Sequence, residues 1–179
     1  MSSRWVETPD HVQDSGPGLP EGFRAAGVAC GLKPSGGLDL GLLVSDAPDT
    51  TSAARFTRSG VLAAPVLLTQ ERVRLDAIRA VAANAGNANA ATGRRGIEDA
   101  ARMQGGASMA AGIREDQVAV ASTGVIGVPL DVDKVIKGIL AARSELAPYG
   151  DDTFGEAIRT TDKFAKSASL DVALPSGTG

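Results

Sequence analysis

The residues that most constrain this chain run from Val118 to Gly127, where an apolar stretch leads directly into Ser122-Thr123-Gly124. The pattern predicts a buried strand that ends in a tight turn, because glycine follows the apolar run and recurs at Gly127. Such a turn can direct a backbone N–H and a threonine hydroxyl at one point in space. Fixed donors of this kind stabilise the oxyanion that forms during acyl transfer. Simple strand-to-turn chemistry is the alternative interpretation of these residues.

A nucleophile and base for such chemistry are not evident. The one histidine, His11, lies in an N-terminal segment rich in Pro, Gly, Ser and charge. We therefore expect no Ser–His–Asp or Cys–His triad and no histidine metal site within this chain. The single cysteine, Cys30, is interpreted as a small buried apolar residue, and one cysteine allows no disulfide within the chain.

The composition excludes several classes of protein. Hydrophobic residues make up 43% of the chain but aromatic residues only 3%, so we expect a core of Ala, Val, Leu and Ile. The net charge of −3, without a block of Lys or Arg, gives no basis for binding nucleic acid or an anionic membrane. No apolar run approaches a membrane span and no secretory signal is recognisable, so the sequence predicts a cytoplasmic protein.

The order of the elements predicts an α/β fold with a sheet covered by helices. Residues 1–20 are expected to form a disordered tail and residues 21–179 the folded part. The predicted strands, in addition to the one at 118–121, are residues 40–44, 55–57, 65–68, 78–83 and 168–174. The predicted helices are residues 96–111 with Gly112 at the C-terminus, a segment N-capped by Asp131, and a segment from a capping box at 153–156 to about 160.

The last predicted strand, residues 168–174, alternates apolar and polar side chains and precedes a turn signal at 175–179. We expect this strand to lack its partner, which leaves an unpaired edge. The sequence therefore predicts an incomplete piece of a fold, completed by a second polypeptide or by further sequence.

Three asparagines follow the predicted strand at 78–83, in the run Asn84-Ala85-Gly86-Asn87-Ala88-Asn89. Their spacing favours a turn with asparagine in the left-handed conformation and side-chain hydrogen bonds to the backbone. The alternative is that these amides orient a substrate or brace an oxyanion loop. At the end of the last predicted helix, Thr160-Thr161-Asp162 is interpreted either as a solvated helix end or as a hydroxyl that faces a substrate.

Together these segments resemble the ornithine acetyltransferase family, also called bifunctional glutamate N-acetyltransferase. The matching residues, in the family's order, are Gly22–Val28, Ala63–Leu67, Asn84–Asn89, Ala121–Gly127 and Thr160–Asp162. The resemblance implies a precursor that cleaves itself before a threonine into α and β chains that stay associated in an αββα layered fold. This chain is similar to the α chain, truncated before the cleavage site, and we expect it to be inactive by itself.

The resemblance also implies roles for individual residues. Thr123 and Gly124 would form the oxyanion hole and Thr160 would contact the substrate, while the nucleophile is the N-terminal threonine of the β chain, with its own α-amine as base. The implied reaction is ping-pong transfer of acetyl from N-acetylornithine to glutamate in arginine biosynthesis, without a metal or organic cofactor, in an α2β2 heterotetramer. A self-processing amide hydrolase or aminopeptidase of similar fold and a non-catalytic binding module are the alternatives.

Overall fold

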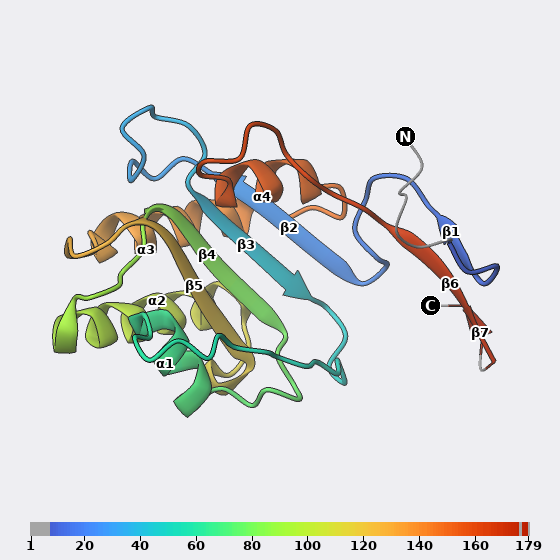
Figure 1. The fold of residues 1–179 in the computed structure, drawn as a ribbon, viewed down its shortest axis with the longest axis horizontal. Coiled ribbons are helices and arrows are strands. Elements are labelled where there is room, and N and C mark those ends of the chain that lie inside the picture. The colour runs from blue at the N-terminus through green and yellow to red at the C-terminus, as the bar shows by residue number, and fades with distance from the viewer. Residues whose placement is uncertain (1–7, 176, 179) are drawn as a thin grey trace.

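Figure 1 shows the computed structural model, which describes residues 8–175 and 177–178. Its main sheet has the strand order β2-β3-β4-β5, with β2 (Phe23–Val28), β3 (Leu40–Ser45), β4 (Ala80–Asn87) and β5 (Val118–Val125). The β2–β3 and β3–β4 pairs are antiparallel, whereas β4 and β5 are parallel. The parallel pair is joined through α2 (Gly93–Ala111) and the short 3₁₀ turn η1 (Glu115–Gln117). The predicted α/β class is confirmed.

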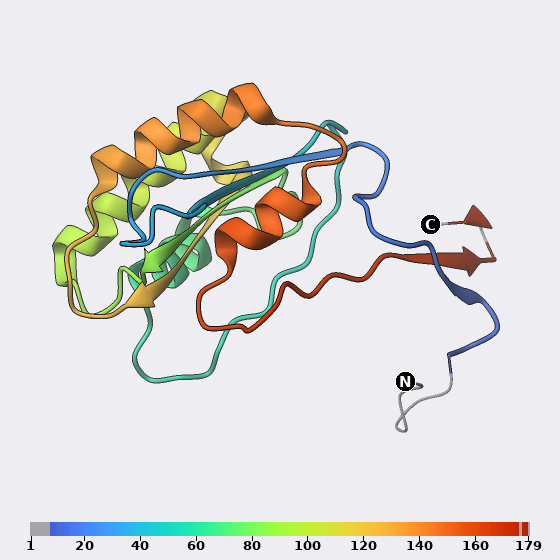
Figure 2. The same ribbon diagram turned by 90° about the horizontal axis from the view of Figure 1, so that it is seen from above.

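Helices lie on both faces of this sheet, as Figure 2 shows. Helices α1 (Ala64–Arg72), α2 and α3 (Val132–Glu145) share the first face with the core, and α4 (Asp151–Ile158) packs mainly on β2 and β3 from the second. The largest buried core side chains are aliphatic or Met: Leu40, Leu42, Leu68, Met103, Val118, Leu130, Val135 and Ile139. The predicted aliphatic core is therefore confirmed.

Helix α4 approaches β2 and β3 closely because glycines face it. A Cβ at Gly27 would collide with the backbone of Thr153, and a Cβ at Gly41 would lie 2.8 Å from the Phe154 ring. The N–H of Gly27 also donates to Thr153 Oγ1 at 3.1 Å. The predicted capping box at 153–156 is wrong, because α4 already begins at Asp151 and Thr153 holds the helix against β2.

Two other helix boundaries agree with the sequence. Helix α2 contains the predicted segment 96–111 and ends at Gly112, which has the left-handed φ of 68°. Asp131 caps α3 as predicted, since its side chain accepts a hydrogen bond from Lys134 N at 3.3 Å.

Two predicted strands are wrong. Residues 65–68 lie in α1, where Pro65 occupies the first turn, a position that needs no backbone N–H. A short apolar run of this length does not distinguish a strand from a buried helical turn. Residues 55–57 have no regular structure, and no described strand pairs with them.

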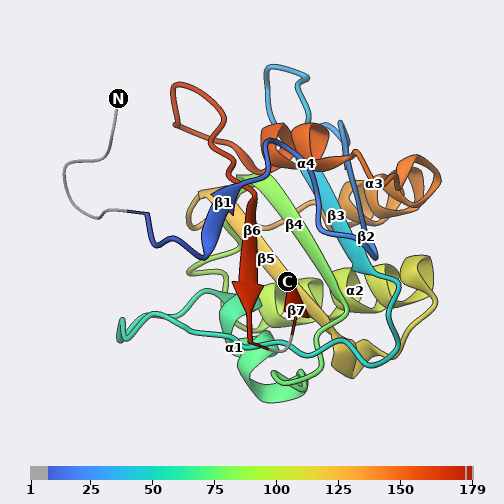
Figure 3. The same cartoon turned by 90° about the vertical axis from the view of Figure 1, so that its right-hand side faces the viewer.

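A separate antiparallel ribbon contains β1 (Val12–Asp14), β6 (Leu170–Leu174) and β7 (Gly177–Thr178). Figure 3 views it from its own side, with β6 between β1 and β7. The predicted strand at 168–174 is thus confirmed, but the expectation that it lacks a partner is wrong, because Val12 pairs with Val172 and Leu174 with Gly177.

The ribbon also bears on the predicted disordered tail, residues 1–20. Its described part, residues 8–20, includes β1, whose backbone groups are satisfied by pairing with β6. Residues 1–7 of the predicted tail, and Ser176 and Gly179 of the predicted turn at 175–179, lie outside the described residues. Within residues 8–175, no helix combines the length and the apolar character needed to cross a membrane.

Candidate active site

The predicted donors lie at the end of the edge strand β5. Thr123 and Gly124 are inside the strand, opposite Ala85 and Gly86 of β4, rather than in a turn that follows it. The sequence prediction placed the turn too early because β4 continues through Asn87 and keeps β5 paired beyond the apolar run. The last buried residue of β5 is Val120, whereas the pairing with β4 continues to Val125. Thr123 is therefore exposed although it lies in a strand.

The N–H of Gly124 lies on the open side of this edge strand. Backbone groups of a strand alternate in direction, so residues of the same parity point the same way. Val120 turns its N–H and C=O toward Thr69 Oγ1 of α1, both at 3.4 Å, whereas Val125 O accepts from Ala88 N at 2.9 Å. Gly124 shares the parity of Val120, which indicates that its N–H points away from β4.

Glycine is required at both positions of the Gly86–Gly124 pair. Gly124 has a φ of 132°, and a Cβ there would lie 2.6 Å from Asn87 N and 2.7 Å from Gly86 O. Gly86 has a φ of 102°, and a Cβ there would lie 3.0 Å from the carbonyl of Leu32. The ends of β4 and β5 are thus packed tightly against each other and against the loop after β2.

Three asparagine side chains hold the ends of β4 and β5. Asn84 accepts from Ser122 Oγ at 2.6 Å and donates to Asn87 O at 2.8 Å. Asn87 donates to Val128 O at 3.1 Å and accepts from Asn89 N at 2.8 Å, while Asn89 has a φ of 44°. The favoured sequence interpretation, a turn with asparagine in the left-handed region, is confirmed for Asn89 only, because Asn84 and Asn87 lie within β4. The bonds to Ser122 and Val128 also show that the amides brace the end of β5.

The sequence prediction missed Asp39, which organises the neighbouring loop. Its fully buried carboxylate accepts hydrogen bonds from the backbone N–H groups of Cys30, Leu32 and Lys33, at 2.6, 2.6 and 2.9 Å. Burial disfavours the charged form, but these bonds outweigh it and hold the pKa of Asp39 below its ordinary value. The only sequence signal was a carboxylate directly before the buried run that starts at Leu40.

The loop around Asp39 also connects to α4. Lys33 Nζ donates to Leu38 O at 2.6 Å and to Ala157 O at 3.3 Å, so a cation sits at the C-terminal end of this helix, where it is favourable. Burial and the hydrogen bond with Asp39 raise the pKa of the Cys30 thiol in the same loop to about 12, which disfavours a thiolate. The side chain is half-buried rather than buried as predicted.

Thr160 follows the end of α4 and is exposed. Arg159 fixes the segment by donating to the carboxylate of Glu156 at 2.6 Å and to Asp162 O at 2.8 Å. Among the described residues, Thr160 makes no hydrogen bond with Thr123 or Gly124. The structure thus places Thr123 and Gly124 side by side in β5, whereas Thr160 lies after the end of α4.

A pH dependence of stability follows from Asp39. Its folded-state pKa lies below the unfolded value of about 3.9, so its stabilising contribution is present above that pH and is lost as the pH falls through the folded-state pKa. Asp39→Asn should remove this dependence and lower the free energy of unfolding at neutral pH by about 2 kcal/mol, because the new NH₂ group faces backbone donors. Urea unfolding between about pH 3 and 7 measures both effects. The exposed Asp49→Asn is the control, and an equal loss of stability in both variants would contradict the role of Asp39.

Among residues 8–175 and 177–178, no group of three or more His, Cys, Asp or Glu side chains is arranged to hold a metal ion.

The fold and the site define an α/β protein whose edge strand offers an exposed hydroxyl next to a backbone N–H that strand parity directs outward. The chain belongs to the ArgJ family, whose model matches residues 24–178. The resemblance to ornithine acetyltransferases is confirmed.

Individual relatives agree with this assignment. The chain is 46% identical over 161 residues to the arginine biosynthesis bifunctional protein ArgJ of Symbiobacterium thermophilum, covering 89% of this chain and 40% of the relative. It is 40% identical over 164 residues to the protein of the same name from Bacillus anthracis, which covers 91% of this chain and 40% of the relative. The chain therefore spans about 40% of the length of these curated relatives.

Solved structures have the same fold. The ornithine acetyltransferase of Mycobacterium tuberculosis, solved in complex with ornithine, superposes on this chain with a TM-score of 0.81 at 39% identity. The aligned region covers 89% of this chain and 86% of the solved chain. The ArgJ protein of Bacillus halodurans superposes with a TM-score of 0.79 at 37% identity, and the aligned region covers 88% of this chain and 82% of the solved chain.

Proposed function

We propose that this chain is the α half of an acetyltransferase and that Thr123 Oγ1 and Gly124 N–H stabilise the oxyanion of acyl transfer. The observation that carries the proposal is the exposed Thr123 hydroxyl on an edge strand, next to a Gly124 N–H that strand parity directs away from β4. The tight packing of Gly124 on Gly86 keeps the N–H fixed, as an oxyanion donor requires. Membership of a family named for arginine biosynthesis supports the assignment.

In the proposed reaction the nucleophile is the N-terminal threonine of a β chain. Its hydroxyl attacks the acetyl carbonyl of N-acetylornithine, the bond to the ornithine amine breaks, and that amine leaves with a proton. The α-amine of glutamate then attacks the acetyl-threonine ester and releases the threonine hydroxyl. Thr160 contacts the substrate. The M. tuberculosis relative, solved in complex with ornithine, supports an amino-acid substrate of this kind.

The proposed β chain covers the open part of the sheet next to Thr123. Large apolar side chains at the end of β5 and in the following turn are exposed, with exposed fractions of 58% for Val125 and 66% for Ile126. Exposed apolar patches of this kind mark contact surfaces. The proposed assembly is an α2β2 heterotetramer in the cytoplasm that uses no metal or organic cofactor.

Glutamate dependence tests the reaction. This chain together with its β chain should convert N-acetylornithine and glutamate to ornithine and N-acetylglutamate, whereas the chain alone should be inactive because it lacks the nucleophile. Chromatographic assay of both products in the presence and absence of glutamate measures this. Release of free acetate at the same rate without glutamate would favour the amide hydrolase, and no turnover in either case would favour the non-catalytic binding module.

A further inference from the structure

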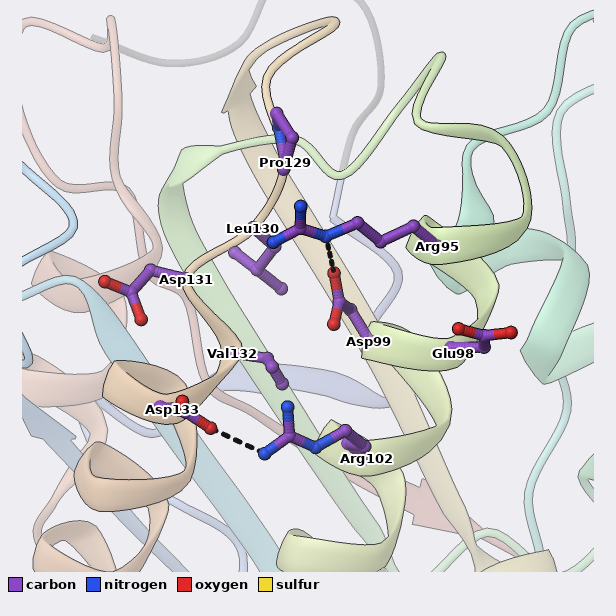
Figure 4. Close-up of a pocket in the computed structure, with 9 residues that line it drawn as sticks. All are labelled: Arg95, Glu98, Asp99, Arg102, Pro129, Leu130, Asp131, Val132 and Asp133. Carbon is purple, nitrogen blue, oxygen red and sulfur yellow. Dashed lines mark hydrogen bonds and ion pairs between the residues drawn. The ribbon is translucent and has the colours of Figure 1, made fainter.

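A groove of about 580 Å³ lies between α2 and the start of α3 (Figure 4). The lining residues come from two segments: Arg95, Glu98, Asp99 and Arg102 from α2, and Pro129, Leu130, Asp131, Val132 and Asp133 from the entry to α3. The groove is on the helix side of the sheet, which Val118 and Val120 face from β5. Thr123 has the opposite parity and points to the other face, so the groove is separate from the candidate active site.

Asp99 is the unusual residue of this groove. It is only 6% exposed, and its Oδ2 atom makes no hydrogen bond to any described residue. The cation beside it is Arg95, whose Nε lies 3.7 Å from Oδ2, which is an ion pair but not a hydrogen bond. A buried carboxylate oxygen without a hydrogen bond costs free energy. The Oδ2 atom is enclosed beside Arg95, and the side chain reaches the groove through the rest of its carboxylate.

The two arginines of the groove differ in what they bind. Arg102 donates to Asp133 at 2.5 Å and is thereby engaged. Arg95 extends over Leu130 and Asp99 in Figure 4, and its side chain is 67% exposed. The groove thus presents a carboxylate that needs a donor next to a guanidinium with free donors.

We propose that this groove binds a free α-amino acid, with its ammonium group on the Asp99 carboxylate and its carboxylate on Arg95. An α-amino acid carries both groups on one carbon, so it can serve two neighbouring opposite charges at once, and charge-assisted hydrogen bonds are the strong ones. Pro129 at the groove wall is available to the aliphatic part of the ligand. This site is additional to the substrate site of the proposed acetyltransferase and does not depend on it.

The groove is coupled to β5 through the asparagine network. Asn89 Nδ2 donates to Gly96 O at the start of α2, at 2.9 Å. Asn87 Nδ2 donates to Pro129 O on the opposite wall, at 3.3 Å. Both walls of the groove are therefore held by the side chains that brace the end of β5.

Binding to the full chain tests the proposal. Isothermal titration with each standard L-amino acid should find at least one that binds with one site per chain, whereas the matching amine without the carboxylate and the matching acid without the amine should not bind. Asp99→Asn and Arg95→Gln should each weaken binding about tenfold or more, because each removes one charge-assisted contact. Arg94→Gln is the matched control, since Arg94 is exposed on the same helix and pairs with Glu98.

Three results would overturn the proposal: no binding by any amino acid, equal binding by the amine alone, or unchanged binding in Arg95→Gln. Arg95 is exposed, so this variant keeps the test decisive even where Asp99→Asn does not fold. Binding that is lost in Thr123→Ala but kept in Arg95→Gln would place the ligand at the edge of β5 and would likewise overturn it.

Discussion

Thr123→Ala should lower the rate of acylation about 100-fold in the assembled enzyme, with little change in substrate binding. Loss of one oxyanion-hole donor typically has this effect, because the donor acts on charge that develops only in the transition state. The Thr123 side chain is exposed at the end of β5 and makes no hydrogen bond among the described residues, so its removal should leave the fold intact. Single-turnover kinetics with N-acetylornithine measure the acylation step.

The controls for this experiment separate a lost hydroxyl from a disturbed strand. Thr123→Ser keeps the hydroxyl and should retain most of the activity, whereas Thr51→Ala removes an exposed threonine hydroxyl elsewhere and should behave like the unchanged protein. An acylation rate in Thr123→Ala equal to that of Thr51→Ala would show that Thr123 is not an oxyanion donor. A parallel rise in KM without a fall in kcat would assign Thr123 to substrate binding instead.

Local sequence signals predicted much of the fold correctly. The strands at 40–44 and 78–83, the helix at 96–111 and the Asp131 cap each depend on periodicity or capping within a few residues. The structure contains all four, although β4 begins at Ala80 and extends to Asn87. The errors arose where contacts between distant segments determine the type or the boundary of an element. The apolar run at 65–68 became the helix α1, and α4 started before its predicted capping box because it docks on Gly27.

The candidate site was predicted in part for the same reason. Thr123 and Gly124 stood out because a strand running into Ser-Thr-Gly is a local pattern, but their position inside β5 depends on pairing with β4. Asp39 was missed, and so was the Arg95–Asp99 pair of the separate groove. Asp39 gains its importance from the loop that folds over it, and Asp99 from α3 packing beside α2, and neither contact leaves a sequence pattern.

Gly124→Ala should lower the free energy of unfolding by roughly 4 kcal/mol, combining two independent costs. A φ of 132° is strained for any residue with a Cβ, at about 1–3 kcal/mol. The added methyl group would also meet Asn87 N and Gly86 O at 2.6 and 2.7 Å, and relieving this backbone contact costs about 1–3 kcal/mol more. Urea unfolding of the full chain measures the sum.

Gly127→Ala separates the two costs of Gly124→Ala. Gly127 has a φ of 79°, so alanine is strained there too, but no atom lies within 4 Å of its Cβ position. It should lose only the strain energy, about 1–3 kcal/mol. Equal losses in the two variants would mean that β5 shifts away from β4 without cost, and Gly124 would then not be locked against Gly86. A larger loss at Gly124 supports the rigid strand end on which a fixed N–H donor depends.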